Sequence, residues 1–267
     1  MGEFTGNVVI VTGASEGIGR ALCLALAPQR PKLVLSARNA GRLESLAAEC
    51  RAAGAETLVV AGDLTDEHAC RALVDATLAH FGRLDTLVAN AGRTMWARVD
   101  EVSDASIFRE VMELNYFSVV SLTLAALPAL KASRGRLVPV ASVAGLTGVP
   151  ARSGYCASKH AMVGFFDSLR IELADTGVTV TLVCPDFVLS EIHRRALDGA
   201  GRPLGQSPMQ EAKIMTAEAC AALMVDAMAA RRRMLITSRR GKLGRWLKAF
   251  APGLVDRIAA RAIATRS

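Results

Sequence analysis

The chain has 267 residues, of which 51% are hydrophobic and 21% are charged, so it can bury a large core and is not a disordered protein. Only 4% of the residues are aromatic, which indicates an aliphatic core. The net charge of +7 is concentrated at the end of the chain. From Arg231 onward eleven Lys and Arg residues accompany a single acid, Asp256, so this part carries +10 and the rest −3. No recognition motif accompanies these basic residues, so we expect no nucleic-acid partner.

The sequence also predicts a location. No run of about 18 uncharged apolar residues is present, and the first residues lack the charged and apolar regions of a signal peptide. The six cysteines form no CxxC pair and show no metal-ligand spacing, so we expect reduced thiols and no metal site. A cytoplasmic protein is the expectation.

Short β-branched runs alternate with helical patterns along the chain, which predicts βαβ units. The expected strands are 8–11, 32–35, 57–60, 84–89, 135–140, 178–184 and 234–237. The expected helices are 17–27, 39–53, 65–82, 103–130, 153–175 and 217–230. We expect Thr65 to cap the third helix and Pro128 to interrupt the last turns of the fourth. The fold class is therefore α/β, a doubly wound parallel sheet of about seven strands with helices on both faces.

A glycine-rich turn lies between the first strand and the first helix and reads Thr-Gly-Ala-Ser-Glu-Gly-Ile-Gly-Arg over residues 12–20. Glycines let the backbone approach a pyrophosphate, and the helix that follows offers free amides and a favourable dipole. The strand–turn–helix context makes this signal much stronger than a glycine pattern alone. We therefore expect a dinucleotide to contact Gly13, Ser15, Gly17, Ile18 and Gly19.

Tyr155 and Lys159 are four residues apart in the helix 153–175 and project from one face of it. An ammonium group held beside a phenol stabilises the phenolate, so such a pair can act as an acid and base near neutral pH. The spacing alone does not separate this role from that of ordinary surface neighbours. Tyr116 is the only other tyrosine, however, so few candidates compete.

Several motifs together resemble the short-chain dehydrogenase/reductase family. They are the Thr-Gly-xxx-Gly-x-Gly turn at 12–19, the Asn-Ala-Gly run at 90–92 and the pair Tyr155-xxx-Lys159. The resemblance spans residues 5–240. It implies a Rossmann-like fold and an NAD(P)-dependent oxidoreductase that acts on CH–OH groups.

The resemblance implies four catalytic residues: Asn115, Ser142, Tyr155 and Lys159. Tyr155 protonates a substrate carbonyl oxygen during reduction, or takes the hydroxyl proton during oxidation. Ser142, thirteen residues earlier, hydrogen-bonds the same oxygen. Lys159 binds the nicotinamide ribose hydroxyls, and Asn115 anchors a water molecule that passes protons to Lys159.

The choice of cofactor is expected to depend on the end of the second strand. NAD sites usually present an acid there, whereas this chain has Arg38 and Asn39. A guanidinium suits a 2′-phosphate and stacks on adenine, so we expect NADP rather than NAD. Glu16 favours NAD mildly, and Arg38 as a merely solvated side chain stays an alternative. The resemblance implies further contacts along the cleft, at Asp63, Leu64, Asn90, Ala91 and Gly92, with Asn90 expected mainly to brace the sheet.

After the sixth strand, the family usually has Pro-Gly followed by a β-branched residue and, two further on, threonine. This chain has Pro185 followed by Asp186, then Val188 and Ser190. Val188 is expected to offer its backbone to the carboxamide, and Ser190 to replace the threonine at the phosphates. Asp186 is a departure: it either tolerates the backbone angle of glycine or lines the substrate pocket.

The chain is expected to divide into one dinucleotide-binding and catalytic domain, 1–240, and a basic amphipathic extension, 241–267. Residues 186–216, rich in Gly, Pro, Arg and Met, are interpreted as a mobile excursion over the site. For the extension two interpretations stay open. It lies on an anionic membrane surface, or it packs across a subunit or covers the substrate mouth with its arginines solvated.

The leading hypothesis is hydride transfer between NADP(H) and a carbonyl or secondary alcohol. The apolar residues of 186–216 favour a lipophilic, steroid-like or acyl-chain-like substrate. The alternative is a non-catalytic dinucleotide-sensing or scaffold protein, which predicts loss of the Tyr, Lys or Ser, all of which are present. Relatives commonly form dimers and tetramers through the long helices, so a homo-oligomer is expected.

Overall fold

The computed structural model describes residues 2–209 and 214–264. The strands are β1 (Val8–Thr12), β2 (Lys32–Ala37), β3 (Glu56–Ala61), β4 (Thr86–Ala89), β5 (Arg136–Pro139), β6 (Thr179–Val180), β7 (Leu182–Cys184) and β8 (Met234–Ile236). The α-helices are α1 (Gly17–Leu26), α2 (Ala40–Ala52), α3 (Glu67–Phe81), α4 (Ser106–Met112), α5 (Ser118–Ser133), α6 (Ser153–Glu172), α7 (Ala217–Ala229), α8 (Arg239–Phe250) and α9 (Pro252–Ala264). Shorter helical turns are η1 (Ala27–Gln29), η2 (Val99–Glu101), η3 (Glu113–Phe117) and η4 (Val143–Gly145).

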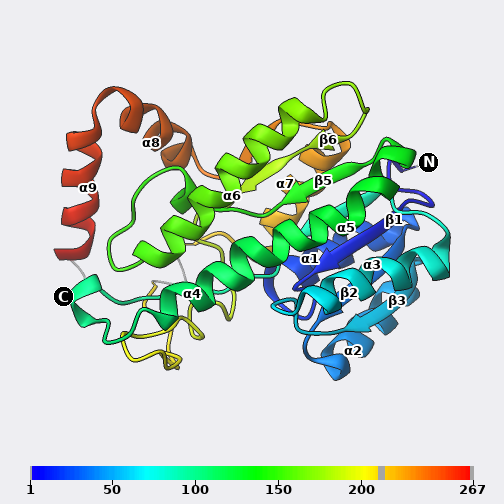
Figure 1. Ribbon diagram of the computed structural model, residues 1–267, viewed down its shortest axis with the longest axis horizontal. Helices are drawn as coiled ribbons and strands as arrows, with labels where there is room; N and C mark the ends of the chain where they lie inside the picture. Colours follow the sequence, from blue (N-terminus) through cyan, green and yellow to red (C-terminus); the bar gives the residue numbers. More distant parts are fainter. Residues whose placement is uncertain (1, 210–213, 265–267) are drawn as a thin grey trace.

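The main sheet is parallel, with strand order β3-β2-β1-β4-β5-β6 (Figure 1). Val11 of β1 pairs with Leu35 of β2 on one side and with Val88 of β4 on the other, so the carboxyl ends of these strands meet at one edge. The chain winds outward from β1 to β3 and then returns to β4 beside β1. Ligands of such sheets bind at the carboxyl edge where the order reverses, so the fold predicts a site between β1 and β4.

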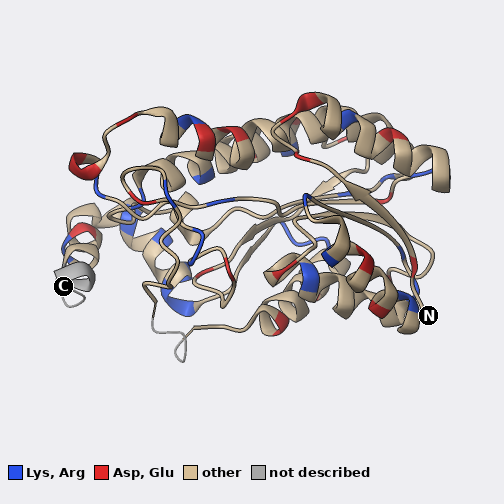
Figure 2. Cartoon of the chain, turned by 90° about the horizontal axis from the view of Figure 1, so that it is seen from below, with Lys and Arg blue, Asp and Glu red and all other residues tan. Residues whose placement is uncertain are grey.

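Helices cover both faces of the sheet, which Figure 2 shows nearly edge-on between them. Val9 and Val11 of β1 pack with α1, α2 and α7, whereas Val8 and Ile10 pack with α3, α5 and α6. Successive side chains of a strand point to opposite faces, so an all-apolar strand contributes side chains to the hydrophobic core on each face of the sheet. Each fully buried Leu, Val or Ile contributes about 2 kcal/mol by leaving water. The predicted α/β doubly wound fold is confirmed.

The prediction of about seven strands in one sheet is slightly wrong. The expected sixth strand, 178–184, is split into β6, which pairs with β5, and β7, which pairs with β8 in a separate ladder. Pro139 explains the break, because it has no N–H to continue the β5 ladder after Thr181 donates to the Leu137 carbonyl (2.9 Å). Pairing resumes where the Ala141 N–H donates to the Val183 carbonyl (2.8 Å).

The helix expected at 103–130 begins at Ser106 and ends at Ser133, with the π-helical turn η3 between α4 and α5. Pro128 lies inside α5 and does not interrupt it, so that expectation is wrong. The carbonyl of Leu124, which the proline leaves without a donor, belongs to a residue that is 65% exposed, so water can satisfy it. By length and composition alone Ser106–Ser133 could cross a membrane, but its apolar face packs on the sheet as a core helix does.

The third helix has a different cap from the one expected. Asp66, not Thr65, is the N-cap of α3, and its carboxylate accepts a hydrogen bond from the His68 N–H (2.9 Å). Thr65 instead hydrogen-bonds Asp63 (2.9 Å). All six cysteines are free and buried.

Candidate active site

A cavity of about 920 Å³ lies at the carboxyl edge of the sheet. One end is lined by the glycine-rich turn and by the residues that follow β2, β3 and β4. The other end is lined by the start of α6, by residues 185–187 after β7 and by α8 and α9, while Ser190 and Arg195 reach back to the glycine-rich turn. One continuous hollow therefore joins the expected dinucleotide end to the residues expected to react.

Every site residue expected from the sequence lines this cavity except Gly19 and Asn115. Gly13 has a φ of +64°, and a Cβ at Gly19 would collide with the Gly13 carbonyl oxygen, so the turn needs glycine at both positions. Asn90 braces this turn from β4, because its side-chain amide donates to the carbonyl of Thr12 (2.9 Å). Gly19 thus shapes the turn rather than facing the hollow.

The ends of β2 and β3 carry charged side chains into the cavity. Arg38 follows β2, is exposed, and forms no ion pair with any residue that the structure describes. Asp63 follows β3, and a hydrogen bond from the Thr65 N–H (3.1 Å) holds the pKa of its carboxyl below the usual range. Asn39, beside Arg38, caps α2 by accepting from the Arg42 N–H (3.0 Å).

Glu16 of the glycine-rich turn is engaged by two arginines. Its carboxylate pairs with Arg42 of α2 (2.8 Å) and with Arg195 of the segment 186–216 (2.7 Å). The second ion pair links the turn to the segment that lies across the cavity. Ser190 of the same segment packs on Gly17, where a Cβ would lie 3.0 Å from the serine Cβ.

Ser142 and Tyr155 line the reacting end of the cavity. Ser142 caps η4: its hydroxyl accepts from the Ala144 N–H (3.1 Å) and donates to the Pro185 carbonyl (3.4 Å). Tyr155 is 7% exposed and is backed by the small apolar cluster that includes Met95, Val111 and Leu197. Both side chains are therefore held by packing while their hydroxyls can meet a ligand oxygen.

Lys159 lies one turn after Tyr155 on α6 and is 4% exposed. Its ammonium donates to the Val140 carbonyl (2.9 Å), contacts the Met162 sulfur (3.3 Å) and lies 5.8 Å from the Tyr155 ring centroid. No carboxylate among the described residues pairs with it, and burial lowers its pKa to about 7. The helical spacing thus brings Tyr155 and Lys159 together at a site that is almost fully shielded from solvent.

Asn115 does not line the cavity but lies directly behind it, in the π-helical turn η3. Its amide accepts from the Arg93 N–H (2.8 Å) and donates to the Arg93 carbonyl and to the Ser158 hydroxyl (both 2.9 Å). Around Gly92, the Asn115 oxygen and the Lys159 ammonium converge from two helices, at 3.0 and 3.7 Å from the position of a Cβ there. Residue 92 therefore has to be small.

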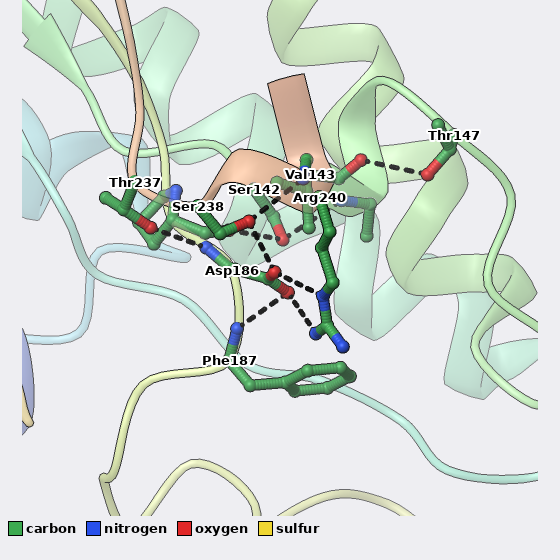
Figure 3. A network of polar contacts seen from close by, with 11 residues as sticks. Ser142, Val143, Thr147, Asp186, Phe187, Thr237, Ser238 and Arg240 are labelled. Atoms are coloured by element: carbon green, nitrogen blue, oxygen red, sulfur yellow. Dashed lines mark hydrogen bonds and ion pairs between the residues drawn. The ribbon is translucent and has the colours of Figure 1, made fainter. Parts of the chain in front are cut away.

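Asp186, the departure from the family pattern, has no positive φ; it lines the cavity, but its carboxylate is not free there. Figure 3 shows its carboxylate between Ser238 (2.6 Å) and the guanidinium of Arg240 (2.6 and 2.7 Å), and its N–H donating to Thr237 (3.0 Å). Burial alone would raise the pKa of Asp186, but the hydrogen bonds from Arg240 and Ser238 outweigh it and hold the pKa below the usual range. Asp186 thus fastens the start of α8 to the strand end beside Ser142.

The two C-terminal helices extend from this anchor, at the end of the molecule opposite the N-terminus (Figure 1). Leu243, Leu247, Val255 and Ile258 line the cavity, so the described part of the extension forms part of its wall. Lys248 makes a second attachment, to the His160 ring on α6 (3.1 Å). Residues 265–267 of the predicted extension lie outside the described part of the chain.

Residues 7–200 match the family described as short chain dehydrogenase. The chain belongs to this family. Among curated relatives, 11-beta-hydroxysteroid dehydrogenase A of Sesamum indicum is 34% identical over 95% of this chain and 74% of its own length.

Two solved structures extend the likeness of this short-chain dehydrogenase to the whole fold. A short chain dehydrogenase/reductase from Burkholderia phymatum in complex with NAD has a TM-score of 0.84 and 30% identity, and the match covers 95% of this chain and 96% of that one. An alcohol dehydrogenase from the archaeon Thermococcus sibiricus complexed with 5-hydroxy-NADP has a TM-score of 0.74 and 27% identity, with 86% and 95% covered.

The short-chain dehydrogenase is therefore an NAD(P)-dependent oxidoreductase that acts on CH–OH groups, and this prediction is confirmed. The non-catalytic alternative is set aside. The residues present fit a dinucleotide: the turn has no room for a side chain at Gly13 or Gly19, and the cavity continues from it to Tyr155. When bound, the nicotinamide supplies or accepts the hydride.

Several cavity residues were missed by sequence reasoning. Arg42 lies one turn into α2 beside Arg38, and Arg93 directly follows the Asn-Ala-Gly run, so both positions gave some signal. Arg152, three residues before Tyr155, gave none beyond proximity to a motif. Their packing is decided by contacts with segments distant in the sequence.

Proposed function

We propose that this short-chain dehydrogenase transfers hydride between NADP(H) and the carbonyl or alcohol carbon of a lipophilic, steroid-like or acyl-chain-like substrate. The observation that carries the proposal is the single cavity in which Tyr155 and Ser142 meet apolar walls from α8 and α9. Leu243, Leu247 and Ile258 are suited to an apolar body rather than to a small polar substrate. The name of the sesame relative supports a steroid-like substrate.

In this proposal each side chain of the reacting end has one task. Tyr155 gives its hydroxyl proton to the carbonyl oxygen during reduction and takes it back during oxidation. Ser142 donates a hydrogen bond to the same oxygen and fixes its position. Lys159 holds the ribose hydroxyls and favours the phenolate of Tyr155, and Asn115 keeps the loop at Arg93 beside it.

The preference for NADP rests on the free guanidinium of Arg38. Glu16, the residue that favours NAD in the sequence, is already neutralised by Arg42 and Arg195. A 2′-phosphate beside Arg38 therefore meets an unpaired cation and no free acid on the turn. The two structural neighbours differ in this respect, because one is complexed with NAD and the other with a derivative of NADP.

The test is oxidation of NADPH and of NADH against a panel of ketones that increase in size and apolar character. We expect turnover with NADPH, at a higher kcat/KM for the larger apolar ketones, and at least about 10-fold lower kcat/KM with NADH, the cost of one charge-assisted contact. R38Q should remove most of this preference, whereas R30Q, a charge change outside the cavity, should not. Equal use of both cofactors would contradict the NADP proposal, and no turnover at all would contradict the substrate class.

We also propose that the outer face of α8 touches an anionic membrane surface. The rings of Trp246 and Phe250 are stacked, with their centroids 6.4 Å apart, and the two side chains are 63% and 81% exposed. The basic residues Lys242 and Arg245 lie on the same helix. An exposed aromatic pair flanked by cations is the pattern of an interfacial helix. An apolar substrate would then enter from the membrane through the mouth that this helix covers.

Flotation with vesicles of phosphatidylserine and phosphatidylcholine tests this contact. The W246A/F250A variant should lose most of the binding, whereas L223A, which removes a 37% exposed side chain from α7, should keep it. Binding that is equal for neutral vesicles, or that survives W246A/F250A, would contradict the proposal.

We propose further that the protein assembles through the long helices. Phe117 and Leu124, next to and in α5, and Ile171, in α6, are 48%, 65% and 75% exposed, an unusual amount of apolar surface on core helices. L124E should shift the mass measured by light scattering toward the monomer, and an unchanged mass would contradict this interface.

A further inference from the structure

Arg152 is the cavity residue that the proposed chemistry does not use. It immediately precedes α6, is 5% exposed and lines the cavity three residues before Tyr155. No carboxylate among residues 2–209 and 214–264 forms an ion pair with it. An arginine that is buried without an anion is costly, because the guanidinium loses its hydration and gains no opposite charge.

Two other arginines of this chain, in contrast to Arg152, are paired with a carboxylate. Arg136 is 4% exposed, and its guanidinium pairs with Glu3 and donates to Asn7 (3.2 Å) and to the Met228 carbonyl (3.1 Å). Arg240, which contacts the same Phe187 ring as Arg152, pairs with Asp186. Arg152 differs from both because its anion is missing from the described chain.

The guanidinium of Arg152 is nevertheless fixed in place. Its Nε and Nη2 donate to the Thr94 hydroxyl (3.2 and 2.7 Å), and its Cζ lies 4.3 Å from the Tyr155 ring centroid. The rings of Trp96 and Phe187 contact it at 5.6 and 5.7 Å. Cation–π contacts of this kind hold a cation without neutralising it.

The hydrogen-bonding capacity of Arg152 is not filled. A guanidinium has five N–H donors, and two of them go to Thr94. No other hydrogen bond of this guanidinium is seen among the described residues, and its nearest polar neighbour is the Tyr155 hydroxyl. The free donors therefore lie beside the hydroxyl that meets the reacting oxygen, on the wall of the cavity.

We propose that Arg152 binds an acidic group of the substrate, so that the substrate is an apolar oxo acid or hydroxy acid whose carboxylate lies close to the reacting carbon. The inference deepens the proposed function and depends on it. The carboxylate meets the free N–H donors of Arg152, the carbonyl oxygen meets Tyr155 and Ser142, and the apolar remainder lies along α8 and α9. Arginine suits this role, since its planar fork matches a carboxylate.

A second role for Arg152 must be separated from this one, because the same guanidinium can also stabilise the Tyr155 phenolate. That role would affect every substrate equally. Binding of a carboxylate affects only substrates that carry one. A matched pair of substrates, one acidic and one neutral, therefore distinguishes the two roles.

The experiment compares 2-oxodecanoate and 4-oxodecanoate with their methyl esters, using NADPH and the full-length protein. The wild type should prefer at least one acid over its ester. R152Q should lower kcat/KM for that acid about 30-fold or more, mainly through KM, as expected when one partner of a buried charge pair is removed. For the ester the change should stay within about threefold. R152K, which keeps the charge but not the fork, should lie between them.

R98Q is the matched control, since Arg98 pairs with Asp100 on the surface outside the cavity, and it should leave both substrates unchanged. A wild type that does not prefer either acid would overturn the inference without any variant, so misfolding of R152Q cannot obscure the result. Equal losses on acid and ester in R152Q would overturn it as well. Turnover of neutral ketones alone overturns only the role of Arg152, whereas no turnover of any compound overturns the proposed function and this inference together.

Discussion

The two ends of the cavity are built in different ways. At the dinucleotide end, hydrogen bonds between the backbone and short side chains of adjacent strand ends hold the wall together. The Thr12 hydroxyl, for example, accepts from the N–H groups of Asn90 and Ala91 (2.9 and 3.0 Å). At the substrate end, the walls come from the segment after β7 and from α8 and α9, and side-chain ion pairs such as Asp186–Arg240 attach them.

The difference separates what the sheet determines from what the attached segments determine. The carboxyl edge of a doubly wound sheet presents the dinucleotide site whatever the later segments do. Substrate choice belongs to residues that the sheet does not position. Changes at the first end should therefore affect all substrates alike, and changes at the second should depend on the substrate.

The largest effect is expected for Y155F. Tyr155 lines the reacting end, but it lies on α6 rather than on the attached walls and gives its proton to every substrate. Removing its hydroxyl should lower kcat about 10³-fold for every ketone, the usual contribution of a positioned acid. NADPH affinity, measured by fluorescence titration, should change little. Y116F removes the hydroxyl of the other tyrosine, which does not line the cavity, and should keep full activity. A kcat within 10-fold of wild type for Y155F would contradict the assignment of the proton donor.

The buried Lys159 should make the stability of the free protein depend on pH. The folded chain releases this proton at about pH 7, whereas the unfolded chain keeps it until about 10.5. Because the unfolded state binds more protons within this window, the free energy of unfolding should rise as pH increases from 7 to 10.5.

Urea unfolding of the wild type and K159M at pH 7 and pH 9.5 measures this contribution. K159M should be the more stable at pH 7, and the difference should shrink toward pH 9.5. A pH dependence that is the same in both proteins would show that other groups cause it. S168A, a change at an exposed and non-ionisable residue of α6, serves as the control.

A smaller and substrate-dependent effect is expected for D186A. Without the carboxylate, Arg240 and Ser238 lose their partner and α8 loses its anchor, so kcat/KM for large apolar ketones should fall about 10-fold, the effect of one charge-assisted hydrogen bond of roughly 1.4 kcal/mol. Small ketones should be less affected. R240Q should reproduce the pattern, whereas R239Q should not. An equal loss for all ketones would show that the two ends of the cavity are not separable.

The smallest effect is expected for E16Q, which weakens the ion pairs between the turn and Arg42 and Arg195. Exposed pairs of this kind contribute about 0–1 kcal/mol, so the affinity for NADPH should rise by no more than about threefold as Arg42 is freed, with little change for NADH. E49Q breaks the Arg20–Glu49 pair outside the cavity and is the control. A weaker affinity for NADPH in E16Q would show that the ion pairs hold the site together.

The comparison also explains which parts of the protein could be predicted from the sequence. The glycine-rich turn and the Tyr155–Lys159 pair are local patterns whose geometry follows from a helix or a turn. The partner of Asp186 lies 54 residues further along the chain, and the anchoring role of Asp186 depends on it. No local pattern indicates that Arg152 is buried without an anion. Pro139 is unusual in a buried strand, but the sequence does not show that the split falls in the neighbouring sixth strand.

The π-helical turn η3 restricts the number of residues that can join α4 to α5. Ile107, Val111, Asn115 and Val119 are all buried and recur at every fourth position. In a regular α-helix each such step drifts by about 40°, so the row would rotate away from the sheet. The wider turn takes up this drift, which lets the apolar residues face the core while Asn115 faces Arg93 and Ser158. Apart from Asn115, this part of the site should therefore tolerate many substitutions but not a deletion or insertion of one residue between 113 and 117.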